Sequence, residues 1–312
     1  MCIRDSRRTV GELLPEPDGD TPPAPPDAPS AEAPSRPEPV PPPANDLVFR
    51  AGGRIVEVYA TVTDSRGRYV DNLNASQFAV LEEGQPKPVF AFENHTAGVS
   101  VALVFDTTGS MVTALPPLKN AAMQLVEDLR PTDSVAVYSF NDTVTELQPF
   151  TSDKAAAQRA ILKTHAAGIT ALYDALVRVN RDLAARPGKK VVIVFTDGSD
   201  NASMLTANVA IERAKARGIP IYTIAEGEAL TNPQLIAELG NMSQSTGGIP
   251  FLIRKLSDIG EVFDKVSQDL MHGYLVAFQP APGDNHVWRK IEVVLSGPKG
   301  LHVRAREGFY VE

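Results

Sequence analysis

The sequence predicts an α/β fold in which a doubly wound, mostly parallel sheet is flanked by a small β-sandwich. Two observations predict this fold. Between residues 98 and 272, short apolar runs alternate with segments of helical periodicity, which is typical of a parallel sheet covered by helices on both faces. The flanking segments 47–97 and 273–312 contain short alternating runs separated by turn residues, which is typical of antiparallel strands.

The composition excludes several classes of function. The chain has 312 residues, enough for one large domain or two smaller ones. Its net charge of −8 argues against nonspecific binding of nucleic acid, which needs a basic surface. No apolar run reaches the roughly 18 residues of a transmembrane helix, so no transmembrane segment is predicted. The single cysteine, Cys2, excludes an internal disulfide and a thiolate metal site.

The segment 1–46 is predicted to be a disordered, proline-rich leader. Residues 15–43 hold thirteen of the 26 prolines, a composition that favours a semi-rigid, partly polyproline-II spacer over a packed core. A spacer that displays a domain and an ordinary disordered tail are both open interpretations. The hexapeptide Met1–Ser6 resembles a translated sequencing-adapter scar. We therefore expect it to be artefactual and the native signal peptide to be missing.

The N-terminal β block, 47–97, has three predicted strands. Apolar residues alternate from Ile55 to Thr63, and further strands are expected at Phe78–Leu81 and Val89–Phe92. Turn residues separate these runs. A unit of this size is too small to be stable by itself.

The C-terminal β block, 273–312, has strand patterns at Tyr274–Phe278, Trp288–Leu295 and Leu301–Tyr310. Because each block has an apolar face to bury, we expect the two blocks to pack together as one β-sandwich. The α/β domain, 98–272, would then be an insertion between them.

The central segment supplies the parallel sheet and its helices. Apolar strands are expected near 99–105, 134–140, 191–196, 220–225 and 250–253. Helices are expected between these strands. One begins after Pro116, and another spans Leu172 to Leu183, each with apolar residues at helical spacing.

Five oxygen-bearing side chains form the candidate metal site. They are Asp106, Thr108, Ser110, Thr170 and Asp197. The two aspartates directly follow predicted strands, and ligands of an open α/β sheet bind at the carboxyl ends of its strands. Thr108 and Ser110 share the loop after Asp106, and Thr170 follows a glycine loop elsewhere. Oxygen-only ligands suit Mg²⁺, Mn²⁺ or Ca²⁺ rather than zinc or copper.

Each part of this set has a simpler interpretation. The segments 106–110 and 196–200 are rich in turn residues, and Thr170 could cap a helix. Together, in this order and in this fold, the five residues indicate a site for binding a partner through a metal ion.

These residues resemble a known motif. Asp106-x-Thr108-x-Ser110, with Thr170 and Asp197, is similar to the metal-ion-dependent adhesion site (MIDAS) of von Willebrand factor A domains, whose first motif is D-x-S-x-S. Thr108 replaces the usual serine, which keeps the hydroxyl but stiffens χ1.

The resemblance extends beyond these positions. Segments 168–174 and 194–201 resemble the later motifs, so that the likeness covers about 98–272. The flanking segments resemble those of the VWFA-related bacterial proteins of the acidobacterial type; they are Val62–Arg68, Phe78–Gly84 and Val303–Tyr310.

The resemblance implies a Rossmann-like fold and a role in cell adhesion or another protein–protein interaction. It implies a divalent cation, Mg²⁺ first, with Mn²⁺ or Ca²⁺ as alternatives. Ser110, Thr108 and Thr170 would contact the cation directly, whereas Asp106 and Asp197 would act through water or change shells. A Glu or Asp of the partner protein would complete the coordination.

The last helix of the domain, Leu256–Met271, has one apolar stripe. The resemblance implies that a downward shift of this helix accompanies high affinity, so it is a candidate affinity switch. An ordinary packing helix is the alternative.

The sequence gives little support to catalysis. A phosphatase with Asp106 as nucleophile would need a second aspartate two residues later, where Thr108 stands. No phosphate-binding P-loop occurs, and the histidines suggest no catalytic pair. We therefore predict that the chain is not an enzyme.

Two other functions remain open. The domain could be an intracellular assembly factor that works with an AAA-type ATPase, or a structural module with an inactive metal site. The proline-rich leader and the β blocks favour a secreted, periplasmic or cell-surface protein, as expected of an adhesion module.

Overall fold

The computed structural model describes residues 54–94, 98–297 and 299–311. These residues all belong to one compact unit, Gly52–Glu312. The predicted leader, 1–46, lies outside the described residues. None of the described helices is long and apolar enough to cross a membrane.

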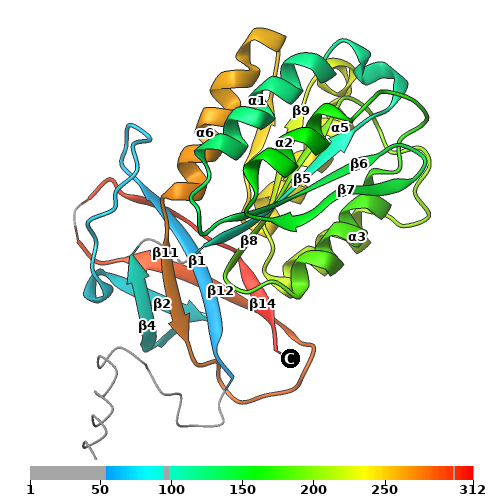
Figure 1. Ribbon diagram of the computed structural model, residues 1–312. Coiled ribbons are helices and arrows are strands. Elements are labelled where there is room, and N and C mark those ends of the chain that lie inside the picture. The colour runs from blue at the N-terminus through cyan, green and yellow to red at the C-terminus, as the bar shows by residue number, and fades with distance from the viewer. Residues whose placement is uncertain (1–53, 95–97, 298, 312) are drawn as a thin grey trace, which may run out of the picture. The chain divides into compact units, whose positions relative to one another are not determined.

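The central sheet has six strands in the order β10-β9-β8-β5-β6-β7. All neighbours are parallel except β6 and β7, which are antiparallel (Figure 1). The strands are β5 Val99–Asp106, β6 Ser134–Phe140, β7 Val144–Thr151, β8 Lys189–Thr196, β9 Ile221–Ala225 and β10 Pro250–Leu252. The mostly parallel sheet predicted from the sequence is therefore confirmed.

Helices cover both faces of this sheet. α1, α2 and α6 pack on one face and α3, α4 and α5 on the other (Figure 1). The α-helices are α1 Leu115–Asp128, α2 Lys154–Leu162, α3 Leu172–Ala184, α4 Ala207–Arg217, α5 Pro233–Thr246 and α6 Ile259–Met271. Short 3₁₀ helices are η1 Ala75–Gln77, η2 Gly109–Val112, η3 Gly227–Thr231 and η4 Leu256–Asp258.

Strand β5 shows why the apolar runs are continuous. Val101 and Leu103 belong to the core under α1, α2 and α6, whereas Ala102 and Val104 belong to the core under α3, α4 and α5. Successive side chains of a strand point to opposite faces. Since both faces are covered, the five consecutive residues 101–105 are all apolar.

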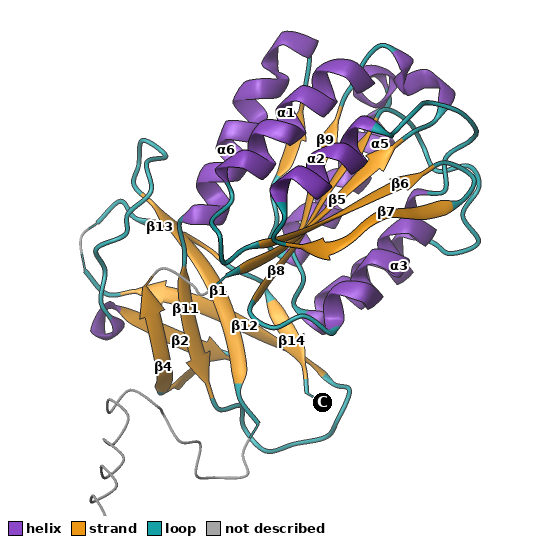
Figure 2. Ribbon diagram, in the orientation of Figure 1, coloured by secondary structure: helices purple, strands orange, loops and turns teal. Residues whose placement is uncertain are grey.

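The flanking segments form two antiparallel four-stranded sheets, in the orders β13-β1-β11-β4 and β14-β12-β2-β3 (Figure 2). The strands are β1 Val56–Thr63, β2 Phe78–Glu82, β3 Gln85–Lys87, β4 Val89–Asn94, β11 Tyr274–Phe278, β12 Trp288–Leu295, β13 His302–Arg304 and β14 Gly308–Tyr310. Each sheet combines strands from before and after the central sheet. The fold class is thus confirmed, while the domain boundaries near 46, 97 and 272 stay a prediction.

The two antiparallel sheets share one core. Phe78 of one sheet packs against Tyr274 of the other, with ring centroids 4.8 Å apart. Val58 and Val276 of the first sheet and Val80 of the second belong to the same buried cluster. This arrangement buries the apolar face of each sheet.

A buried ionic cluster joins α6 to the β-sandwich. Asp269, near the end of α6, accepts hydrogen bonds from the guanidinium of Arg304 on β13 and from the hydroxyl of Tyr222 on β9. Lys189 of β8 donates through Nζ to the carbonyl of Asp269, at 3.2 Å. Burial raises the pKa of Asp269, but the charges of Arg304 and Lys189 outweigh it and hold the pKa below its ordinary value.

Candidate metal centre

The strand order places Asp106 at a switch point of the sheet. From β5 the chain continues to β6 on one side, and β8 later pairs with β5 on the other side. The carboxyl end of β5 therefore lies between two diverging connections, where open α/β sheets bind ligands. Phe105 pairs with Phe195 in the register of β5 and β8, so Asp106 and Thr196 end their strands side by side.

The carboxylate of Asp106 is held by two donors. Its Oδ1 accepts from the backbone N–H of Thr108 at 2.9 Å, and its Oδ2 accepts from the hydroxyl of Thr196 at 2.8 Å. The first contact bends the loop after β5 back toward the strand end. Thr108 is buried with Asp106, whereas Ser110 on the same loop is exposed.

Ser110 connects the loop after β5 to the loop after β8. Its hydroxyl donates to Asp197 Oδ1 at 2.9 Å and lies 3.1 Å from the hydroxyl oxygen of Thr108. Asp106, Thr108, Ser110 and Asp197 thus form one hydrogen-bonded chain. Four of the five predicted residues are brought together at the carboxyl ends of β5 and β8.

Thr170 is held at the same edge by its backbone. Its N–H donates to Asn201 Oδ1 at 2.9 Å, and its carbonyl accepts from the N–H groups of Asn201 and Ala202, each at 3.0 Å. The carbonyl of Gly168 in turn accepts from the N–H of Gly109, at 3.5 Å. Thr170 is a buried residue, and its hydroxyl forms no hydrogen bond with the residues that the structure describes.

Thr170 does not cap the helix that follows it. The N-cap of α3 is Ala171, and no side chain caps that end from the N-cap position. The capping role is therefore wrong for Thr170.

The carboxylates at this edge repel one another. Asp106 is fully buried and Asp197 nearly so. Burial, with a smaller effect of Asp197, raises the pKa of Asp106 to about 6, although hydrogen bonds from Thr108 and Thr196 oppose the rise. Burial and the charge of Asp197 also raise the pKa of Glu226, which directly follows β9. A cation placed here would relieve this repulsion.

The donor set fits a hard cation. Among the described residues there is no group of three or more His, Cys, Asp or Glu side chains that could hold a metal ion. The site combines two carboxylates with hydroxyl oxygens instead. Such donors match the ligands that Mg²⁺, Mn²⁺ and Ca²⁺ take in proteins.

Comparison with known proteins decides the family. Residues 100–265 match the sequence profile of the von Willebrand factor type A domain, more than half of the 312 residues. The chain belongs to the von Willebrand factor type A (VWA) domain family. No curated protein matches it.

Solved structures share the VWA fold at low identity. A von Willebrand factor type A protein from Catenulispora acidiphila is 16% identical, with a TM-score of 0.52, over 85% of this chain and 76% of its own. Proximal thread matrix protein 1 from the mussel byssus, with a zinc-occupied MIDAS motif, is 21% identical, with a TM-score of 0.51, over 62% of this chain and 50% of its own. The vWF domain of the type V pili tip protein Mfa5 from Porphyromonas gingivalis is 16% identical, with a TM-score of 0.48, over 56% of this chain and 95% of its own. The likenesses to the first two structures show the fold alone.

Sequence reasoning missed three residues of this edge of the VWA domain. Thr196 binds Asp106, Asn201 positions Thr170, and Glu226 donates through its backbone N–H to the carbonyl of Thr196 at 3.2 Å. Glu226 had a readable indicator, because it ends an apolar run as Asp106 and Asp197 do. The roles of Thr196 and Asn201 depend on how the loops fold, which residue spacing does not show.

Helix α6 of the VWA domain packs behind the candidate site. The ring of Phe263 stacks on that of Phe195, with centroids 5.0 Å apart. Phe195 directly precedes Thr196, which binds Asp106. The contact connects α6 to the site, and the affinity switch predicted for this helix stays a prediction.

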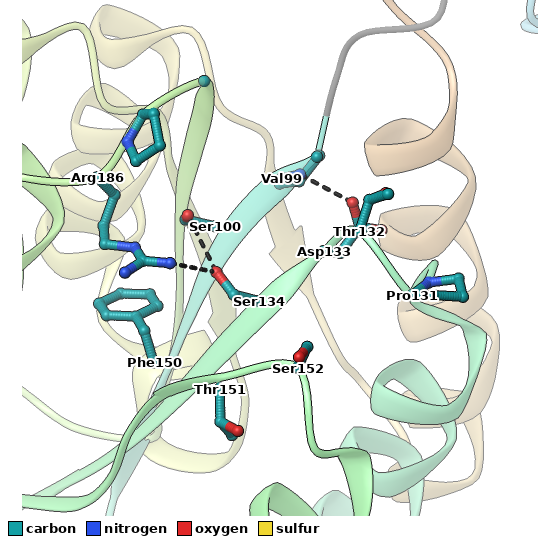
Figure 3. Close-up of a pocket in the computed structure, with 13 residues that line it drawn as sticks. Val99, Ser100, Pro131, Thr132, Asp133, Ser134, Phe150, Thr151, Ser152 and Arg186 are labelled. Carbon is teal, nitrogen blue, oxygen red and sulfur yellow. Dashed lines mark hydrogen bonds between the residues drawn. The ribbon is translucent and has the colours of Figure 1, made fainter. Parts of the chain in front are cut away.

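A pocket of about 610 Å³ lies at the opposite ends of the strands (Figure 3). Its lining includes Ser100 and Ser134, near the starts of β5 and β6, with Phe150 and Arg186. Arg186 Nη2 donates to Ser134 Oγ at 3.3 Å, and the guanidinium lies 5.1 Å from the ring centroid of Phe150. Since none of the five predicted residues lines this pocket, it is not the candidate metal centre.

Proposed function

We propose that this chain is a non-enzymatic protein-binding module of the adhesion type that depends on a divalent cation. The observation that supports it best is the hydrogen-bonded chain through Asp106, Thr108, Ser110 and Asp197. These residues, with Thr170, would hold the cation, which we propose to be Mg²⁺. When bound, the cation would supply an electrophilic centre for a carboxylate.

The partner would be a protein that presents Asp or Glu. Hydroxyl donors are neutral, so the two aspartates here only balance a divalent charge. An additional carboxylate from outside is then attracted to the cation more than to any group of the chain. Asp106 and Asp197 would hold the charge in place, and Ser110 and Thr108 would orient it through the contacts between their hydroxyls.

A related fold supports the presence of a metal. The mussel byssus protein holds zinc at its MIDAS motif, whereas the oxygen donors of this chain favour Mg²⁺. We further propose a secreted, periplasmic or cell-surface location, in keeping with the proline-rich segment that precedes the described residues.

Calorimetric titration of Mg²⁺, Mn²⁺ and Ca²⁺ into the full chain tests the proposal. We expect one site that is lost in Asp106→Ala, because the variant removes the most buried carboxylate of the set. Asp284→Ala, at an exposed position of the β-sandwich, is the matched control and should bind as the wild type does. Equal binding by Asp106→Ala and the wild type would place the cation elsewhere and contradict the proposal.

A further inference from the structure

Three exposed apolar side chains stand on the three loops that carry the candidate metal ligands. Their exposed fractions are 62% for Val112, 55% for Ile169 and 94% for Met204. Val112 ends η2, which contains Ser110. Ile169 directly precedes Thr170, and Met204 lies on the loop that follows β8. We call these three residues the apolar rim.

The backbone around Met204 is fixed although its side chain is exposed. The N–H groups of Met204 and Leu205 donate to the two carboxylate oxygens of Asp174, each at 3.0 Å. The N–H of Ser203 donates to Asp200 Oδ1, also at 3.0 Å. Asp200 in turn accepts from the backbone of α3. The loop therefore presents an apolar side chain to solvent from a position that α3 determines.

The backbone at Ile169 is held on both sides. Gly168 has a positive φ of +89°, and a Cβ there would lie 3.0 Å from the side chain of Asn141, so glycine suits this position. On the other side, the N–H of Thr170 donates to Asn201. Ile169 is thus held outward between two fixed neighbours.

Val112 is turned outward by the burial of its neighbour. Met111 is almost completely buried, and its N–H donates to the carbonyl of Thr108 at 3.1 Å. In a helical turn, adjacent residues point in different directions. Val112 therefore faces solvent next to Ser110.

The apolar rim differs from ordinary exposed apolar residues because its three members all lie on the loops that carry the candidate metal ligands. Single exposed apolar residues are common on protein surfaces. The other large exposed apolar residues of the described part of the chain are Phe90, Leu162, Leu252 and Val287. They stand on β4, at the end of α2, on β10 and just before β12, and none of them lies on the three loops that carry the candidate ligands. Exposed apolar side chains on the loops of a candidate ligand site are placed to contact the ligand that binds there.

The charges around the site limit what this surface can bind. Three acids lie at the carboxyl ends of neighbouring strands: Asp106 ends β5, Asp197 follows β8 and Glu226 follows β9. Their negative charges would repel a second or third acidic side chain of a partner. A partner segment with one carboxylate for the cation and apolar side chains for the rim complements both features.

We infer that the partner segment presents a single Asp or Glu flanked by apolar side chains, which contact Val112, Ile169 and Met204. This inference rests on the proposed function and adds the chemical class of the partner. The acid would make binding of the partner segment depend on the cation, and the flanking apolar residues would determine which segments bind.

A peptide array with a central Glu tests the inference. The two positions on each side of the Glu are Leu and Phe in one set, Ser in a second and Glu in a third. Binding of the full chain is measured in Mg²⁺ and in EDTA. We expect the apolar set to bind about tenfold more tightly than the Ser set, since the three rim side chains become buried. The Glu-flanked set should bind no more tightly than the Ser set.

Variants test whether the apolar rim causes the preference for apolar flanking residues. The triple variant Val112→Ser, Ile169→Ser, Met204→Ser should lose the preference for apolar flanks, yet still bind Mn²⁺ in calorimetry. The control Phe90→Ser, Val287→Ser alters exposed apolar residues of the β-sandwich and should keep the preference.

The outcomes separate this inference from the proposed function. Equal binding of the apolar and Ser sets, still dependent on the central Glu and on Mg²⁺, would overturn the inference and leave the proposed function intact. A preference that persists in the triple variant would also overturn it. Metal binding without any Glu-dependent peptide binding would contradict the proposed function, and the inference with it.

Discussion

Two buried aspartates of this chain have opposite electrostatic surroundings. Burial raises the pKa of Asp269, yet Arg304 and Lys189 outweigh it, and the net shift is downward. Burial also raises the pKa of Asp106, and there the nearby Asp197 adds to the rise, giving a value of about 6. Asp269 thus has its counter-charge within the chain, whereas Asp106 has only uncharged donors and another acid.

This difference in surroundings indicates different roles: the charge of Asp269 stabilises the fold, whereas the charge of Asp106 is available to a ligand. A buried carboxylate that its own chain neutralises holds elements together, as Asp269 does between α6, β9 and β13. Within the described residues Asp106 is given no cation of the chain, so its charge costs stability until a cation from solution binds. Three predictions sharpen this comparison, from the largest expected effect to the smallest.

The largest effect should come from Arg304→Met. The variant removes the main counter-charge of the buried Asp269, and breaking a buried pair in this way costs about 3–5 kcal/mol in the free energy of unfolding. Urea denaturation measures the loss. The control is Arg68→Met, which removes an exposed arginine that pairs with Asp64 at 2.7 Å, and it should change the free energy of unfolding little. Equal losses in both variants would mean that the buried pair has no special role.

The second effect concerns pH and Lys189. Burial lowers the pKa of Lys189 to about 8, although Asp269 opposes the shift. Between this value and the ordinary lysine pKa of about 10.4, the unfolded chain binds more protons than the folded chain. The contribution of Lys189 to the free energy of unfolding therefore increases as the pH rises through that range.

The variant Lys189→Met should lack this gain. Its free energy of unfolding relative to the wild type should fall by about 1–2 kcal/mol between pH 8 and pH 9.5. Urea denaturation at the two pH values measures the change. Lys265→Met is the control, at an exposed lysine of α6 that pairs with Glu261. Its difference from the wild type in the free energy of unfolding should be the same at both pH values. A constant difference for Lys189→Met would show that the buried amine does not titrate in this range.

The sequence predicted most of the sheet because its central strands are buried on both faces. Continuous apolar runs such as 99–105 and 191–196 leave little ambiguity. Strand β7, Val144–Thr151, was missed because it lies at the edge of the sheet and is largely polar, with Pro149 inside it. An edge strand has only one neighbour, so its sequence can resemble a loop.

The candidate site was partly predictable for a related reason. Residues that follow neighbouring parallel strands meet at one edge, so the proximity of Asp106 and Asp197 follows from the strand pattern. No comparable sequence pattern predicts the ionic cluster around Asp269. Asp269 and Arg304 belong to different elements, and on a helix an aspartate normally faces solvent. Only the folded arrangement of α6 against β13 reveals this pair.

The smallest effect is that of Asp106→Asn, and its comparison with Asp269→Asn is the most direct test, because the two variants should change the free energy of unfolding in opposite directions. In EDTA, Asp106→Asn should raise the free energy of unfolding by about 1 kcal/mol, since it removes a disfavoured charge and keeps the shape of the side chain. Thr196 can then donate to the carbonyl of Gly198, already 3.3 Å away. Asp269→Asn should instead lower the free energy of unfolding, because it leaves the buried Lys189 and the partly buried Arg304 without their counter-charge.

Adding Mg²⁺ completes this test. A bound cation stabilises the folded wild type by mass action, so Mg²⁺ should raise the melting temperature of the wild type and of Asp269→Asn but not that of Asp106→Asn. Differential scanning fluorimetry with and without the cation measures both effects on the same samples. If Asp106→Asn loses stability in EDTA as Asp269→Asn does, Asp106 is a structural residue like Asp269. The contrast between a charge used for folding and a charge kept for a ligand would then be wrong.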